Sequence, residues 1–367
     1  MNARSEIVDL TRRLVAVPSV SAEKRDLDTV IELVVQELKD LPDVQLHVRS
    51  AAGFPMLVVT FDDQREADVM LNAHLDVVPA RATQWTVEER DGRLYGRGTQ
   101  DMKGAGAVYI RVIKDIAALP ADQRPRVIFQ FVTDEEIGGA HGTAQLRDEG
   151  WTSSLFIAGE PTDMQICHGA KGILWVEIEQ PGVPAHGSRP WEGVNPIERL
   201  AHGLRRLLDI YPPPSEAIWR TTVTAAIISG GDSGNRIPAS ANLRLDVRWT
   251  PEEGADAVIA NIERAFANET PPHARVVVRQ RGTALLTSAD DPQIERIKTA
   301  QHAALGAAPT TFREHFGSDA RFYSDVNIPA VCWGPVGAGL HTDDEWVSID
   351  GLLDYYNAVR VLLGIKN

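Results

Sequence analysis

The first half of the chain alternates helical patterns with short apolar runs that are rich in β-branched residues. The hydrophobic periodicity predicts helices near residues 4–17, 25–40 and 103–118, and strands near residues 55–61, 68–73, 126–132 and 154–158. This alternation predicts an α/β fold in which a mixed, largely parallel sheet is flanked by helices. In open sheets of this kind ligands bind beyond the carboxyl ends of the strands, and several candidate functional residues follow predicted strands.

The pattern changes near Lys171. The next segment predicts the order β-α-β-β-α-β of a ferredoxin-like module, with strands near 173–179, 221–229, 243–249 and 274–280 and helices near 196–210 and 252–266. Helix and strand patterns alternate again after residue 283. The sequence therefore predicts a first domain made of residues 1–170 and 283–367, and an inserted α+β domain made of residues 171–282.

Charge and cysteine content argue against several classes of partner. The 367 residues include 37 Lys and Arg against 51 Asp and Glu, without a basic block, so we expect neither a nucleic-acid nor a membrane partner. Cys167 and Cys332 are too few for a disulfide framework and are expected to be small buried hydrophobic residues. The first 15 residues predict an amphipathic helix without a signal sequence, which favours a cytoplasmic location.

A histidine and a carboxylate two residues apart end the apolar run near 68–73. Residues two apart in a strand face the same side, so Asp76 could accept the ring N–H of His74 while the other ring nitrogen binds a cation. Asp101 lies in the glycine-rich segment GRGTQDMKGAG, which could bring its carboxylate close to the same cation. Taken singly, the first motif is more often a surface loop and the second more often a turn.

Further carboxylates and a histidine follow strands or lie in glycine-rich loops. Glu135 and Glu136 belong to a run of three acids whose like charges repel unless a cation or protons compensate. Glu160 follows the strand predicted near 154–158, and His341 lies in the loop GPVGAGLHTDDE. A solvated turn explains each of them singly. Together the histidines and carboxylates suit two divalent ions, with Zn²⁺ as the leading candidate and Co²⁺ or Mn²⁺ as alternatives.

The segments HLDVVP, GTQDMKG, DEEIGG, GEPT and GPVGAGLHTDDE, in this order and spacing, resemble the M20 family of dinuclear zinc amidohydrolases and peptidases. This family includes acetylornithine deacetylase and succinyl-diaminopimelate desuccinylase, and the resemblance covers nearly the whole chain. It implies that Asp101 bridges two metal ions. His74 and Glu160 would complete the protein ligands of one ion, and Glu136 and His341 would complete those of the other.

The same resemblance implies roles for residues that do not bind metal. Glu135 would be the general base and acid, and Asp76 would orient His74. The peptide between Asp101 and Met102 would be cis. Residues 1–170 and 283–367 would be the metal-binding catalytic domain, and residues 171–282 would be a lid or dimerisation domain. His186, in the segment GVPAHGSRP, resembles a lid histidine that stabilises the tetrahedral oxyanion, often across a homodimer formed through the lid domain.

Four residues are candidate substrate contacts, and their motifs are less distinctive than those of the metal ligands. Asn235 and Arg248 resemble positions that contact the substrate α-carboxylate in related carboxypeptidases, and an arginine fork suits that group. A salt bridge within a strand is the alternative explanation for Arg248. Ser318 and Arg321 lie in the segment GSDARF, which resembles SDGRF of desuccinylases with Ala320 in place of glycine.

These expectations combine into one function. The chain is expected to hydrolyse the amide bond of an N-acyl-L-amino acid, as a deacetylase or desuccinylase does, through a metal-bridging hydroxide with Glu135 as general base. The alternative within the family is a carboxypeptidase or dipeptidase that acts on short peptides. The alternative of another class is a non-catalytic metal-binding or amino-acid-binding protein that has kept the fold.

Overall fold

The computed structural model describes residues 2–365, which form two compact units. The first unit contains the residues up to Gly169, Leu285–Arg313 and the chain from Ser318 onward, and the second contains Ala170–Ala284 and Glu314–Gly317. The predicted domain boundaries lie within two residues of these, apart from Glu314–Gly317. Residues 1 and 366–367, at the two ends of the predicted first domain, lie outside the described residues. The use of the second unit as a lid remains a prediction.

The first unit is built on a mixed sheet. Its strands lie in the order β1 (Gln45–Ala51), β2 (Phe54–Thr60), β7 (Val127–Val132), β4 (Val69–His74), β9 (Phe156–Ala158), β19 (Ala330–Cys332), β10 (Ile166–Ala170) and β17 (Leu285–Leu286), and β18 (Thr311–Glu314) pairs with β10. β4 runs parallel to β7 and β9, and β9 runs parallel to β19. Every residue of β2, β4 and β7 is buried, as expected for central strands covered on both faces. The predicted fold class is confirmed.

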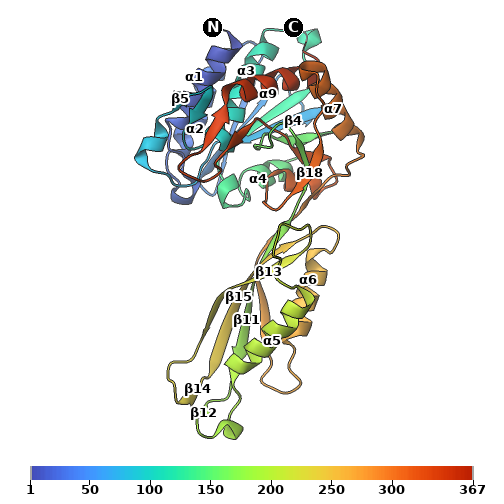
Figure 1. Cartoon of the computed structure of the whole chain (residues 1–367). Coiled ribbons are helices and arrows are strands. Elements are labelled where there is room, and N and C mark those ends of the chain that lie inside the picture. The colour runs from blue at the N-terminus through green and yellow to red at the C-terminus, as the bar shows by residue number, and fades with distance from the viewer. Residues whose placement is uncertain (1, 366–367) are drawn as a thin grey trace. The chain divides into compact units, whose positions relative to one another are not determined.

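Helices cover this sheet (Figure 1). They are α1 (Ala3–Val15), α2 (Leu27–Leu38), α3 (Gly104–Ala117), α4 (Thr143–Asp148), α7 (Pro292–Leu305), α8 (Ala320–Ser324) and α9 (Ile349–Leu362). α3 packs against α1 and α9, α9 packs against α7, and α4 packs against α8. The side chains of Asn2, Asp291 and Ser348 cap the first turns of α1, α7 and α9, which fixes where these helices begin.

Short strands connect the loops of the first unit. β20 (Gly337–Ala338), β21 (Trp346–Ser348), β6 (Arg93–Tyr95) and β5 (Glu88–Arg90) form a small sheet, and β3 (Glu66–Ala67) pairs with β8 (Thr152–Ser153). β21 pairs with β6 and β20, so the loop between β20 and β21 is held beside the segment that follows β6. That loop carries His341, and the segment after β6 leads to Asp101.

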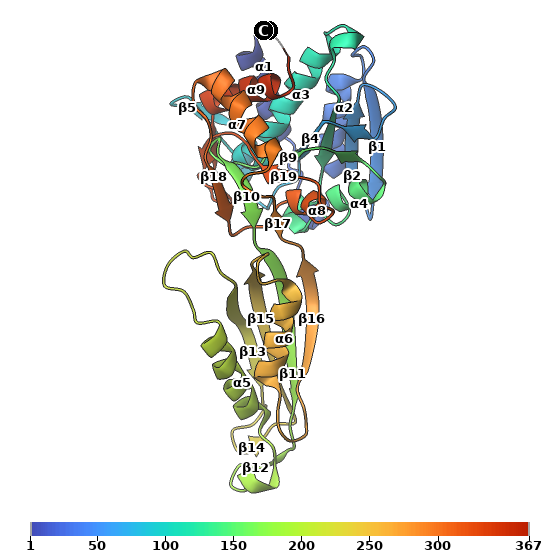
Figure 2. The ribbon, with the colours of Figure 1, turned by 90° about the vertical axis from the view of Figure 1, so that its right-hand side faces the viewer.

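The second unit is an antiparallel sheet with two helices. Its strands lie in the order β13 (Thr222–Gly230), β15 (Ser240–Trp249), β11 (Gly172–Pro181) and β16 (Arg275–Gly282). The helices α5 (Pro196–Ile210) and α6 (Ala255–Phe266) share an apolar core with β11 and β15, and Figure 2 shows them on one face of the sheet. A two-stranded ribbon, β12 (Ala185–His186) and β14 (Arg236–Ile237), extends this unit. The four strands of the sheet and the two helices follow one another along the chain in the predicted order, whereas the ribbon was not predicted.

Within residues 2–365 no helix has the length and apolar character needed to cross a bilayer. Both cysteines are buried and free, as the sequence predicted.

Candidate metal centre

The carboxyl ends of three neighbouring parallel strands bring four of the predicted site residues together. His74 is the last residue of β4, and it pairs in register with Val132, the last residue of β7. Glu135 and Glu136 lie in the turn that follows β7, and Glu160 follows β9 by two residues. Because parallel strands end at the same edge of the sheet, these side chains share one region.

Asp101 and His341 reach the same region from irregular segments. Asp101 lies in Thr99–Lys103, directly before α3, and its peptide bond to Met102 is cis, as the resemblance implied. The turn before it requires Gly98, because φ there is +82° and a Cβ atom would lie 2.8 Å from a methyl carbon of Val77. His341 has φ of +60°, in the left-handed region, within the loop between β20 and β21.

Asp101 lies between the two histidines. Its Oδ1 is 2.9 Å from Nε2 of His74, and its Oδ2 is 3.1 Å from Nε2 of His341. Glu136 Oε2 lies 3.1 Å from the same nitrogen of His341, and Glu160 Oε2 lies 3.8 Å from Nε2 of His74. Each oxygen of Asp101 therefore faces a different histidine, which is the arrangement expected of a carboxylate that bridges two ions.

Two groups of side chains have donor atoms close enough to hold an ion each. They are His74, Glu135 and Glu160, and Asp101, Glu136 and His341, with the donor atoms of each group within 4.8 Å of one another. Ligands that are each about 2.0–2.2 Å from one ion have such mutual separations. The structure thus brings together all five predicted ligands. It also places Glu135, predicted to be free of metal, at ligand distance from His74 and Glu160.

The electrostatics of this cluster favour a bound cation. Burial and the charge of Glu160 raise the pKa of Glu135 well above its usual value, and burial raises the pKa of Glu160 to about 7. Asp101 is buried as well, but hydrogen bonds from His341 and His74 hold the pKa of its carboxyl below the usual value. The same contact with Asp101 and that with Glu136 raise the pKa of His341 to about 10. Imidazole and carboxylate donors gathered this closely suit divalent ions such as Zn²⁺.

Asp76 orients His74 differently from the prediction. Nδ1 of His74 lies 3.0 Å from the main-chain oxygen of Asp76, whereas the nearest oxygen of the carboxylate is 3.6 Å away. The carboxylate accepts the main-chain N–H groups of Glu135 and Glu136, at 3.3 Å and 3.1 Å. The prediction that the carboxylate takes the ring proton is corrected, because β4 ends at His74 and the strand alternation ends with it. Asp76 still leaves Nε2 of His74 free to bind a cation, and it also fixes the acidic turn.

Ser318 and Arg321 are both bound to other parts of the protein. The fully buried Ser318 accepts hydrogen bonds through Oγ from the thiol of Cys332 at 3.0 Å and the main-chain N–H of Ala320 at 3.3 Å. The guanidinium of Arg321 donates to the main-chain oxygens of Ser318 at 2.7 Å and Gly138 at 2.8 Å. Arg321 therefore braces the turn that follows the acidic residues, and its predicted contact with substrate stays a prediction.

In the second unit, His186 and Asn235 are neighbours. Their segments pair as β12 and β14, and the N–H of Gly187 donates to the main-chain oxygen of Asn235 at 2.7 Å. Nδ1 of His186 accepts the main-chain N–H of Ser188 at 3.2 Å. Because that nitrogen is an acceptor, the neutral ring carries its proton on Nε2, which makes Nε2 available as a hydrogen-bond donor.

Arg248 is far from these residues within the same unit. On β15 it pairs in register with Ile173, whereas Ser240 at the other end of the strand pairs with Pro181. Eight residues of strand separate Ser240 from Arg248, roughly 27 Å. Arg248 is engaged in a salt bridge with Asp246 at 2.9 Å. Asn235 and Arg248 of one chain are thus too far apart to share a carboxylate held within this unit, and the salt bridge is the interaction observed for Arg248. Their contact with the substrate stays a prediction.

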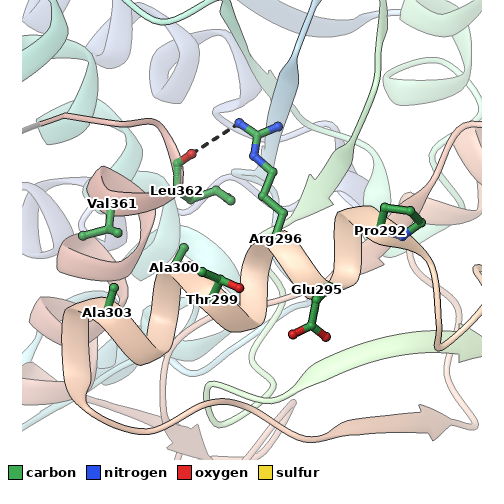
Figure 3. A pocket seen from close by; sticks show the side chains of 8 residues that line it. All are labelled: Pro292, Glu295, Arg296, Thr299, Ala300, Ala303, Val361 and Leu362. Atoms are coloured by element: carbon green, nitrogen blue, oxygen red, sulfur yellow. Dashed lines mark hydrogen bonds between the residues drawn. The ribbon is translucent and has the colours of Figure 1, made fainter.

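A pocket of about 520 Å³ lies between α7 and α9, away from these groups (Figure 3). Its lining residues include Thr299, Ala300 and Ala303 of α7 and Val361 of α9, and Arg296 crosses it to donate to the main-chain oxygen of Leu362 at 3.3 Å. None of the predicted site residues lines this pocket, so the chemistry inferred above does not take place there.

The model of peptidase family M20/M25/M40 matches residues 70–365, a range that contains all the residues of both ligand groups. The chain belongs to this family. The prediction drawn from the sequence motifs is confirmed.

Two relatives illustrate the activities found among M20 proteins. Succinyl-diaminopimelate desuccinylase of Gluconacetobacter diazotrophicus is 28% identical over 377 residues, which cover 96% of this chain and 94% of the relative. "Probable carboxypeptidase AN5749" of Emericella nidulans is 30% identical over 301 residues, which cover 75% of this chain and 70% of the relative.

Solved structures of M20 proteins share the fold. Aminopeptidase PepT of Bacillus cereus matches with a TM-score of 0.80 and 21% identity, covering 98% of both chains. The YXEP protein of Bacillus subtilis, described as a dinuclear metal binding peptidase from the M20 family, matches with a TM-score of 0.69 and 16% identity, covering 99% of this chain and 98% of that one. At these identities the likeness supports the architecture of this M20 chain.

Sequence reasoning missed one buried ion pair beside the centre. Arg97 and Glu345 are 3% and 0% exposed and pair with one another. Arg97 lies in the glycine-rich segment GRGTQDMKGAG, directly before the motif GTQDMKG, and Glu345 ends the motif GPVGAGLHTDDE. Their position in these motifs was the available signal, but their partners could not be read from the sequence.

Proposed function

We propose that this M20 protein hydrolyses the amide bond of an N-acyl-L-amino acid, in the manner of a deacetylase or desuccinylase. The observation that carries the proposal is the position of Glu135. It is a half-buried acid that lies with His74 and Glu160 in one of the two groups of potential ligands, and Asp101 of the other group faces the histidines of both. The relative named succinyl-diaminopimelate desuccinylase, aligned over nearly the whole of both chains, supports this substrate class.

The proposed cofactor is a pair of divalent metal ions, Zn²⁺ first and Co²⁺ or Mn²⁺ as alternatives. His74 and Glu160 would hold one ion, Glu136 and His341 would hold the other, and Asp101 would contact both. When bound, such ions lower the pKa of water and polarise the carbonyl of the scissile amide. The neighbouring fold described as dinuclear metal binding supports two ions rather than one.

Three side chains of the protein have separate roles in the reaction. Glu135 takes the proton of the attacking water and passes it to the departing nitrogen. Burial and the charge of Glu160 raise the pKa of this carboxyl, which makes the carboxylate a stronger base toward the proton of water. His186 would stabilise the oxyanion through the Nε2 proton that its contact with Ser188 leaves free. Asp76 keeps Glu135 in place because its carboxylate holds the main-chain N–H of that residue.

A panel of substrates tests this proposal against its alternatives. We expect kcat/KM for N-acetyl or N-succinyl amino acids to exceed that for dipeptides of the same amino acids by about 100-fold or more, because a site built for one acyl group discriminates by several contacts. The reverse order would assign the chain to the carboxypeptidases or dipeptidases, the function that the second relative favours. Stoichiometric metal binding without turnover of any amide would favour the non-catalytic binding protein.

We also propose that the protein is a homodimer formed through its second unit. β13 is an edge strand whose residues from Thr224 to Gly230 are exposed on both faces. Ile227 and Ile228 are 54% and 59% exposed, and the start of α5 adds Ile197, which lies close to Gly230. Unpaired edges of this kind promote pairing with another chain, and the self-complementary solution is a second copy.

Charges on this edge test the dimer. We expect Ile227→Asp with Ile228→Asp to shift the protein from dimer to monomer in analytical ultracentrifugation, because burying two carboxylates against a second copy is costly. The matched control is Val278→Asp, an exposed position on β16 at the opposite edge of the same sheet, which should leave the dimer intact. A wild-type protein that sediments as a monomer at all concentrations would exclude this assembly.

A cytoplasmic location remains a prediction.

A further inference from the structure

Glu345 touches the main chain of a proposed metal ligand. It lies four residues after His341 and its side chain is fully buried. Oε1 accepts the main-chain N–H groups of Gln100 at 3.1 Å and of Asp101 at 3.2 Å. Oε2 pairs with the guanidinium of Arg97. The carboxylate therefore uses both oxygens on the segment that presents Asp101.

Arg97 contacts the loop that carries His341. Its Nη2 donates to the main-chain oxygen of Thr342, the residue after His341, at 3.3 Å. The side chain of Gln84 donates to the same oxygen at 3.1 Å, and the main-chain oxygen of Gln84 accepts the N–H of Arg97 at 3.0 Å. The guanidinium thus hydrogen-bonds to the loop that carries His341. Glu345 belongs to that loop and hydrogen-bonds to the segment that carries Asp101.

We propose that Arg97 and Glu345 are positioning residues that set the distance between Asp101 and His341, and with it the geometry of the ligand group Asp101, Glu136 and His341. This inference rests on the proposed function, in which those three residues bind one ion. The paired loops are remote in the sequence, since Glu345 is 244 residues from Asp101. Outer contacts of this kind orient metal ligands, and their loss typically weakens metal affinity about 10–100-fold.

Stability alone is a poorer explanation of the pair. Two charges buried at this depth lose much hydration, and well-packed apolar residues of similar volume often stabilise a fold as well or better. The hydrogen bonds that the two side chains make beyond their own contact go to main-chain groups of the two ligand-bearing loops. The feature that distinguishes this pair is therefore the connection between the loops.

The test is a titration of metal-free protein with Co²⁺ alone, followed by calorimetry, for the wild type and for Glu345→Gln. Glutamine keeps the shape and one oxygen acceptor but turns N–H groups toward Arg97. We expect one of the two Co²⁺ ions to bind about 10–100-fold more weakly, with a smaller change for the other. Arg97→Lys should have the same effect to a smaller degree, because one ammonium cannot replace both contacts of the guanidinium.

The matched control is Glu6→Gln. Glu6 is a half-buried carboxylate between α1 and α3 that pairs with Arg111 and Lys114, remote from the ligand loops in its contacts. It should lower the melting temperature without changing either Co²⁺ affinity. Wild-type Co²⁺ affinities in Glu345→Gln, or an equal weakening in Glu6→Gln, would overturn the inference.

Hydrogen exchange of the metal-free protein separates this inference from the proposed function. If Glu345 holds the Asp101 segment, the main-chain amides of residues 100 and 101 should exchange faster in Glu345→Gln than in the wild type. Unchanged protection would overturn the inference even if the wild type bound no Co²⁺. A wild type without Co²⁺ binding would instead refute the proposed function.

Discussion

Replacing Glu135 by glutamine should lower kcat by about 10²–10⁴-fold, the usual contribution of a general acid–base residue, and leave both metal ions bound. The amide has nearly the shape of the carboxylate but cannot accept a proton from water or return one to the leaving nitrogen. The structure makes this a sharp test, because Glu135 lies at ligand distance from His74 and Glu160. The measurements are kcat, and bound metal by elemental analysis, on the same samples.

The matched control for this change is Glu32→Gln, the same substitution on an exposed position of α2. It should retain wild-type kcat and metal content. Loss of one ion in Glu135→Gln would show that Glu135 is a metal ligand in this protein rather than a free base. Near wild-type turnover would remove Glu135 from the reaction altogether.

Removing the metal ions should lower activity by about a thousandfold or more and should destabilise the protein increasingly as the pH rises. The folded-state pKa of Glu160 is raised from 4.5 to about 7, so its ionisation above pH 4.5 costs stability in the metal-free protein. The folded-state pKa of His341 is raised from 6.5 to about 10, so the stability given by its charge is lost as the pH rises through that range. Glu160 and His341 therefore both make the metal-free protein less stable as the pH rises.

Melting temperatures of chelated and metal-loaded protein at about pH 5.5 and about pH 8 measure this effect. The gap between the two forms should widen at the higher pH, because metal also binds better to deprotonated ligands. Readdition of Zn²⁺ or Co²⁺ should restore both activity and melting temperature, which controls for irreversible damage by the chelator. A gap that narrows at high pH would contradict the assignment of the buried acids and His341 to a metal site.

The fold and the ligands were predictable where the signal is local. Strands β2, β4 and β7 are apolar runs buried along their whole length, and residues that follow such strands must meet at one edge of a parallel sheet. β1 was not predicted, because it is an edge strand whose residues are half-buried or exposed and therefore give no clear apolar pattern. β10 was missed as well, since it has only five residues, one of them Gly169.

Contacts that depend on where a strand ends or on how strands align could not be predicted from the sequence. The alternation that suggested a side-chain contact between His74 and Asp76 stops where β4 ends, and the main chain supplies the acceptor instead. The separation of Asn235 from Arg248 follows from the register of β15, which only the paired strands define. The ion pair of Arg97 with Glu345 joins residues 248 apart, and no local pattern predicts such a contact.

The central claim is that Asp101 and the side chains around it hold a pair of metal ions. The most direct measurement is the number of divalent ions bound per chain, determined by elemental analysis of protein reconstituted with Zn²⁺ and then freed of excess metal. We expect two ions in the wild type and fewer in Asp101→Asn, whose amide is a poor bridge between cations. A wild type that holds one ion or none, while it is fully active, would contradict the central claim.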